Sequence, residues 1–113
     1  MEFTITTEEN FAILKLNGSL LADIQSRDVL EGVNNIIQEG KINFIVDLSE
    51  LKFINSSGLG MLLTCLTKAR KAGGDLILAN IPEQVSNLLV ITKLTSVFTP
   101  ADSMEEAKSK FES

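Results

Sequence analysis

Residues 44–60 read FIVDLSELKFINSSGLG, and this stretch decides the fold of the 113-residue chain. It begins with an almost continuous apolar run, residues 44–48, of the kind found in parallel strands that are covered on both faces. A short polar loop follows, and beyond it an apolar pattern with helical spacing is formed by Leu59, Leu62, Leu63, Leu66 and Ala69. The stretch therefore predicts a central strand that a loop joins to a helix.

The residues before this stretch predict a hairpin and a first helix. Residues 3–7 alternate between apolar and polar side chains, residues 8–10 form a polar turn, and residues 11–16 are apolar again. Residues 23–38 then carry one apolar stripe with helical spacing, made of Leu30, Val33, Ile36 and Ile37. Gly40 follows as a residue typical of the end of a helix.

The residues after the stretch predict two further strands and two further helices. Residues 76–79 read as a second buried strand, and Pro82 suits the first turn of a helix that buries Val85, Leu88 and Leu89. Residues 97–98 predict a weaker strand. Residues 103–106 match a capping box, and the helix that follows has an apolar stripe made of Met104, Ala107 and Phe111.

The predicted elements follow one another in the order β-β-α-β-α-β-α-β-α. Strands that are joined through helices are expected to lie parallel in one sheet, because such crossover connections are right-handed. The sequence therefore predicts a single α/β domain over residues 1–113, in which helices pack on a mixed β-sheet.

Composition excludes several classes of function. The formal net charge is -5, without a basic cluster, so we expect no nucleic acid partner. The chain has one cysteine and no histidine, which argues against a disulfide framework, a metal site and histidine acid/base chemistry, and we expect no cofactor. No apolar run is long enough to span a bilayer and the first residues do not resemble a signal peptide, so we expect a cytoplasmic protein without a membrane partner.

The segment between the central strand and the next helix carries the chemistry. Asn55, Ser56 and Ser57 are all good helix N-cap residues, and a serine hydroxyl here would lie beside the positive end of a helix dipole. A phosphate on that hydroxyl would gain from the free N–H groups of the first helical turn. Most caps of this kind have no regulatory role, so the residues alone favour a cap over a phosphorylation site.

Four segments are similar to the STAS domain of bacterial anti-sigma factor antagonists: residues 47–49, 53–60, 71–76 and 81–94. The resemblance covers nearly the whole chain, including the order of its elements. The signature of that family is Asp-Ser-Ser/Thr-Gly-Leu-Gly, and its phosphorylated serine falls on Ser56.

The resemblance implies a function in transcription regulation by partner switching. The unphosphorylated antagonist binds an anti-sigma factor that is also a serine kinase, phosphorylation of Ser56 ends the complex, and a serine phosphatase restores it. Phosphoserine adds about -1.5 to -2 charges at neutral pH, which disfavours a packed interface through desolvation and repulsion. We therefore expect a signalling protein that is a monomer or a weak dimer, and not an enzyme.

The resemblance also implies which residues contact the partner. Those of the Ser56 segment are Asn55, Ser57, Gly58, Leu59, Gly60 and Met61, and two further candidates are Leu21 and Asp23. Gly58 and Gly60 would allow a phosphate or a partner to approach the backbone closely. Met61 lies off the main apolar stripe, which favours an exposed contact over a core position.

Two positions depart from the family pattern. Asn55 replaces the aspartate of the signature, which keeps the capping oxygen but removes a negative charge beside the target hydroxyl. Residues 18–21 read GSLL where antagonists often have Gly-Glu-Leu-Asp, so Leu21 stands in place of an acid. These departures favour an alternative, a STAS interaction module in a signalling or transport-accessory complex that is not phosphorylated.

The other reactive side chains suggest packing or solvation. Cys65 falls between apolar residues of the predicted helix, without a basic partner to lower its pKa, so we expect a buried and unreactive thiol. Asp47, Glu50 and Asp75 share no spacing on one element and receive no catalytic role. A small enzyme or nucleotide binder is the weakest hypothesis, because no phosphate-binding loop is present either.

Overall fold

The computed structural model describes residues 2–20 and 24–112. The elements are β1 (Glu2–Thr7), β2 (Ala12–Leu20), α1 (Ile24–Gln38), β3 (Asn43–Ile54), α2 (Ser56–Lys71), β4 (Asp75–Ala79), α3 (Glu83–Ile91), β5 (Thr99–Ala101) and α4 (Met104–Glu112). This order is the predicted one, and the α/β fold class is confirmed.

The five strands form one mixed sheet in the order β1-β2-β3-β4-β5. β1 and β2 are antiparallel, and the turn between them is closed by a hydrogen bond of 2.8 Å from the Glu8 amide to the Phe11 carbonyl. The pairs β2–β3, β3–β4 and β4–β5 are parallel, as expected for strands that are joined through helices. The carboxyl ends of β2 and β3 therefore meet at one edge of the sheet.

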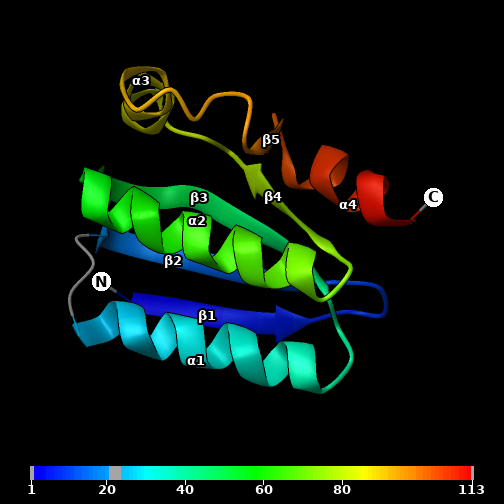
Figure 1. The fold of residues 1–113 in the computed structure, drawn as a ribbon. Coiled ribbons are helices and arrows are strands. Elements are labelled where there is room, and N and C mark those ends of the chain that lie inside the picture. The colour runs from blue at the N-terminus through cyan, green and yellow to red at the C-terminus, as the bar shows by residue number, and fades with distance from the viewer. Residues whose placement is uncertain (1, 21–23, 113) are drawn as a thin grey trace.

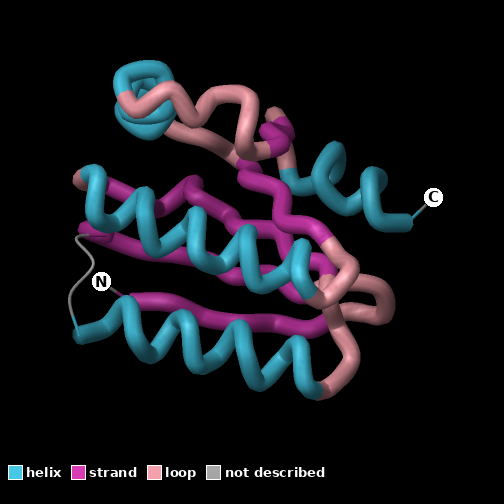
Figure 2. The backbone as a smooth tube through the Cα atoms, viewed as in Figure 1, coloured by secondary structure: helices cyan, strands magenta, loops and turns pink. Residues whose placement is uncertain are grey.

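Three helices cover one face of the sheet and the fourth covers part of the other. Figure 1 shows α1 and α2 side by side on the first face, with α3 apart from them, and Figure 2 shows the same layers as strands and helices. β3 supplies Phe44, Val46 and Leu48 to the larger core under α1, α2 and α3. Ile45 points to the smaller core under α4, so the first half of β3 is buried on both faces.

The second half of β3 corrects the prediction that a short polar loop follows residue 48. The structure continues the strand to Ile54, although β4 ends opposite Asp47 and only β2 pairs with β3 beyond that point. Two register shifts against β2 interrupt the alternation, so that Leu51 and Ile54 follow Leu48 in the core at intervals of three residues. Such bulges break the period of two by which a strand is recognised.

The last predicted strand was also misplaced. Residues 97–98 are not part of a strand, and β5 comprises the next three residues, Thr99–Ala101. Phe98 is instead 4% exposed in the larger core, which explains why an apolar pair here resembled a strand. Pro82 is the N-cap of α3 and lies just before its first turn.

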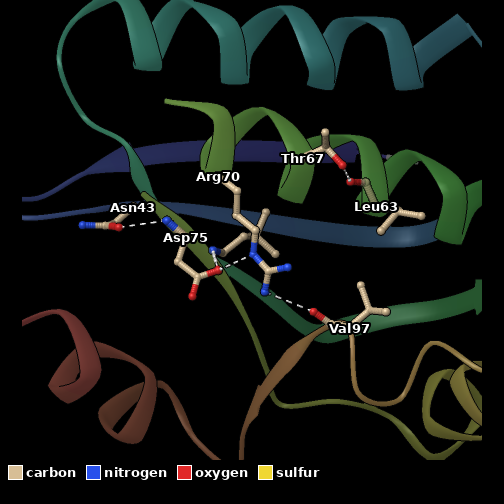
Figure 3. Close-up of polar contacts among 7 residues, drawn as sticks. Asn43, Leu63, Thr67, Arg70, Asp75 and Val97 are labelled. Atoms are coloured by element: carbon tan, nitrogen blue, oxygen red, sulfur yellow. Dashed lines mark hydrogen bonds and ion pairs between the residues drawn. The ribbon is translucent and has the colours of Figure 1, made fainter. Parts of the chain in front are cut away.

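A polar network fixes the end of α2 that lies far from residue 56, as Figure 3 shows. The Arg70 Nε donates to Asp75 Oδ1 at 3.3 Å, and its Nη2 donates to the Val97 carbonyl at 3.2 Å. The Asp75 amide donates to Asn43 Oδ1 at 3.0 Å. Asp75 therefore has a structural role at this end of α2.

None of the helices in the described part of the chain combines the length and the apolar character that a membrane span requires.

Candidate functional site

Asn55 is the residue that starts α2. Its backbone is extended, with φ -113° and ψ 178°, and its Oδ1 accepts a hydrogen bond of 2.8 Å from the Gly58 amide. The Asn55 amide donates to the Leu20 carbonyl at 3.3 Å, which ties the start of the helix to the end of β2. Of the three candidate caps in the sequence, the structure therefore selects Asn55.

Ser56 and Ser57 follow as the first two residues of α2, and both are exposed. Their amides belong to the first helical turn, where N–H groups have no intrahelical carbonyl to bind. α2 has no acidic residue in this turn and has Lys68, Arg70 and Lys71 in its last turn, so its own side chains offset only the negative end of its dipole and leave the positive end uncompensated. The Ser56 hydroxyl is thus accessible at the positive end of a helix whose cap does not depend on it.

Gly58 and Gly60 differ in a way that the sequence does not show. A Cβ atom on Gly58 would collide with the backbone carbonyl of Leu20, so this glycine allows α2 to pack against β2. A Cβ atom on Gly60 would have nothing within 4 Å, and Gly60 is exposed. Only Gly60 therefore leaves bare backbone that a partner can reach.

Leu59 and Met61 do not present their side chains to solvent. Leu59 is 1% exposed, and Met61, which the sequence analysis favoured as an exposed contact, is 5% exposed. That prediction was wrong because α2 packs on both the sheet and α1, so its buried arc is wider than one stripe. The Met61 Sδ lies 3.6 Å from the Cys65 Sγ in the interior.

Phe53 is a candidate contact residue that the sequence pattern did not indicate. Its side chain is 54% exposed, three residues before Ser56 at the carboxyl end of β3. Lys52 beside it is also exposed, and its carbonyl accepts a hydrogen bond of 2.7 Å from Gln84 Nε2 of α3. The only signal in the sequence was an aromatic residue in a stretch that read as a polar loop.

The remaining candidates, Leu21 and Asp23, lie outside the described residues. The described residue before them, Leu20, pairs with Ile54 in the parallel ladder of β2 and β3. The chain therefore leaves β2 beside the start of α2, at the edge of the sheet that carries Ser56.

The buried carboxylate of Asp47 lies where the buried first half of β3 ends and its partly exposed second half begins. Asp47 is 8% exposed, and its Oδ1 accepts hydrogen bonds from the Ser49 amide at 3.0 Å and from Asn80 Nδ2 at 3.1 Å. Burial alone would raise the pKa of Asp47, but these hydrogen bonds and the charge of Lys15 lower it below its ordinary value of 3.8. Asp47 is therefore an ionised structural residue.

Cys65 is buried in the larger core, as predicted. Burial raises the pKa of its thiol from 9.0 to about 12, although the nearby charge of Lys68 acts in the opposite direction. The thiol is protonated at neutral pH and is a poor nucleophile. Among residues 2–20 and 24–112, histidine, cysteine, aspartate and glutamate do not form a group of three that could hold a metal ion.

Comparison with known proteins connects this geometry to a family. The family model described as the STAS domain matches residues 2–107. A Bordetella bronchiseptica protein named as an anti-sigma factor antagonist, BtrV, is 28% identical over 104 residues, which are 86% of this chain and 90% of that protein.

Two solved structures share the fold. The crystal structure of an anti-sigma factor antagonist from Thermotoga maritima has a TM-score of 0.83 at 22% identity, and the match covers 98% of this chain and 95% of that one. The phosphorylated form of the Bacillus cell fate determinant SpoIIAA has a TM-score of 0.75 at 21% identity, over 96% of this chain and 98% of that one. With the family model spanning residues 2–107, these matches confirm the predicted resemblance: the chain belongs to the STAS domain family.

Proposed function

We propose that this protein is an anti-sigma factor antagonist that binds its anti-sigma factor through the surface around Ser56 and is released when Ser56 is phosphorylated. In this role it acts by binding and not by catalysis. The observation that carries the proposal is the exposed hydroxyl of Ser56 in the first turn of a helix that Asn55 caps independently. The similarity to named anti-sigma factor antagonists supports it.

The contact surface has a definite chemistry. Its exposed parts are the ring of Phe53, the hydroxyls of Ser56 and Ser57, and the bare backbone at Gly60. A large apolar side chain beside small polar groups is typical of the centre of a protein interface. A phosphate on Ser56 would place a dianion within this small area, so the partner would lose contact through desolvation without any unfolding of α2.

We propose that the anti-sigma factor is itself the serine kinase that phosphorylates Ser56. The γ-phosphoryl group passes from ATP to the Ser56 Oγ, the hydroxyl loses its proton, and ADP leaves. The neutral Asn55 side chain beside the hydroxyl leaves the product with one carboxylate fewer to repel its phosphate than the family signature would give. A serine phosphatase would return the protein to its binding form.

The test combines phosphorylation with binding. The protein is incubated with its anti-sigma kinase and ATP, the phosphate is located by mass spectrometry of peptides, and affinity is measured by calorimetry. Phosphate on Ser56, absent from Ser56→Ala and present in Ser57→Ala, is expected, together with at least a tenfold loss of affinity in Ser56→Asp. Phosphate elsewhere, or unchanged affinity on modification, would contradict the proposal.

A second function is favoured by one observation, the neutral cap. Because Asn55 replaces the aspartate of the signature, the module could bind its partner without regulation by phosphate, in a signalling or transport-accessory complex. In that case the kinase would leave Ser56 unmodified and Ser56→Asp would bind with the affinity of the natural protein. Phe53→Ala would still weaken binding, so this variant distinguishes an unregulated interface from no interface.

A further inference from the structure

α3 exposes large apolar side chains that belong to neither core of the described residues. Val90 is 64% exposed and Ile91 is 76% exposed, and with Phe53 they are the exposed large apolar residues of the described chain. Residues 84–92 contain no charged side chain. Figure 1 shows that α3 stands apart from the other three helices, so its outer side has no neighbour within the domain.

A hollow lies directly beside these residues. It has a volume of about 220 Å³, and its apolar walls are Val90 and Leu89 of α3, Ile81, Phe98 just before β5, and Pro100 of β5. The lining is mostly apolar, and the volume is sufficient for a branched aliphatic side chain. An exposed apolar side chain, Val90, and an apolar hollow therefore lie next to each other at one short helix.

The charges at the two ends of α3 are complementary. Glu83 is the first residue of the helix and Lys93 lies two residues beyond its last one, and both are exposed. When two copies of such a helix pack antiparallel, the first end of each faces the last end of the other. Glu83 of each copy would then face Lys93 of the other, and the uncharged segment would lie between the two ion pairs.

We propose that α3 is a self-association surface through which two copies of this chain form a twofold dimer, with Val90 and Ile91 of each copy seated against the apolar hollow of the other. A twofold axis requires one patch to be complementary to itself, and α3 meets this requirement in shape and in charge. The dimer uses none of the residues at the Ser56 site. Small interfaces of this kind are weak, so the dissociation constant is expected on the order of 10–1,000 μM.

The first experiment is sedimentation equilibrium of the full chain over that concentration range. The natural protein is expected to show a monomer–dimer equilibrium, and Val90→Glu is expected to weaken it at least about tenfold. Asn35→Glu, which adds the same charge to the exposed side of α1, is the matched control and should associate normally. Circular dichroism checks that both variants keep the helical content of the natural protein.

The second experiment tests the antiparallel arrangement by charge reversal. Glu83→Lys and Lys93→Glu should each weaken association, because each places like charges opposite one another. A mixture of the two variants should restore it, since each end of α3 in one copy then faces the opposite charge in the other. Failure of the mixture to associate more strongly than either variant alone would overturn the arrangement.

Two results would overturn the proposal as a whole. One is a natural protein that stays monomeric throughout the concentration range; if its binding to an anti-sigma factor is then lost in Val90→Glu, α3 serves a different partner. The other is a Val90→Glu variant that dimerises like the natural protein.

Discussion

The two halves of β3 both pair with β2, but they differ in their pairing with β4, in their regularity and in their burial. Residues 44–47 pair with both β2 and β4, alternate regularly and are buried on both faces. Residues 49–54 pair with β2 alone, contain both register shifts and expose Phe53 beside the start of α2. The comparison shows how a strand that is buried along one half can present an exposed second half to another molecule.

The largest expected difference between the halves is in stability. Leu48→Ala removes a fully buried side chain and should lower the free energy of unfolding by about 3 kcal/mol, the range for cavities in cores. Phe53→Ala, at the exposed end, should change it by less than about 0.5 kcal/mol. Urea denaturation of both variants measures this, and equal losses would show that the second half belongs to the core after all.

Gly58 should be the most sensitive position at the end of the exposed half. Gly58→Ala forces α2 away from the Leu20 carbonyl and should cost about 2 kcal/mol, as overpacking does. Gly60→Ala is the control within the same helix, because its Cβ meets open space, and it should instead stabilise by about 1 kcal/mol. Thermal unfolding measures both, and a shift of the same sign in both variants would contradict the close packing of α2 against β2.

Asp47 lies at the boundary between the two halves, and its contribution to the free energy of unfolding should depend on pH. Asp47→Asn removes the charge that strengthens the hydrogen bonds from Ser49 and Asn80, with an expected loss of about 1.5 kcal/mol at neutral pH. Because the pKa of Asp47 is lowered by folding, its contribution is complete above the unfolded value and is lost as the pH falls through the folded value, below 3.8.

The free energies of unfolding of the natural protein and of Asp47→Asn should therefore converge in acid, which urea titrations at several pH values can follow. A difference that stays constant down to the lowest pH would mean that the Asp47 carboxylate does not stabilise the fold through its charge.

A smaller loss of stability than at Leu48, Gly58 or Asp47 is expected at the cap that separates strand from helix. Asn55→Ala should cost about 1 kcal/mol, because the Gly58 amide loses its acceptor. Asn55→Asp retains the acceptor and should keep the stability, while adding a charge beside Ser56. Chemical denaturation separates the two variants, and equal losses would show that the Asn55 side chain does not cap α2.

The sequence predicted the regular parts of the molecule because they follow simple periods. The buried run at residues 44–48 and the stripe on α2 both identify their elements correctly. The predicted cap group also contained the true N-cap, Asn55, and the exposed Ser56. These features depend on neighbours in the sequence or on one face of one element.

The errors occurred where distant segments decide the outcome. The bulges in the second half of β3 exist because β2 continues beside them, which no local period reveals. Met61 is buried because α1 packs against α2, and the close approach at Gly58 depends on the Leu20 carbonyl. Leu21 and Asp23 lie outside the described residues, so those two predictions remain predictions.

The buried thiol of Cys65, the one cysteine of the chain, also allows the opening of α2 to be measured by chemical labelling. A disulfide reagent can modify this side chain only when α2 lifts from the sheet and the thiolate can form, because the folded chain shields the sulfur and raises its pKa to about 12. The labelling rate, divided by that of an unstructured peptide, gives the population of the opened form. Comparing this rate with and without a phosphate on Ser56 would show whether the modification loosens the helix on which it resides.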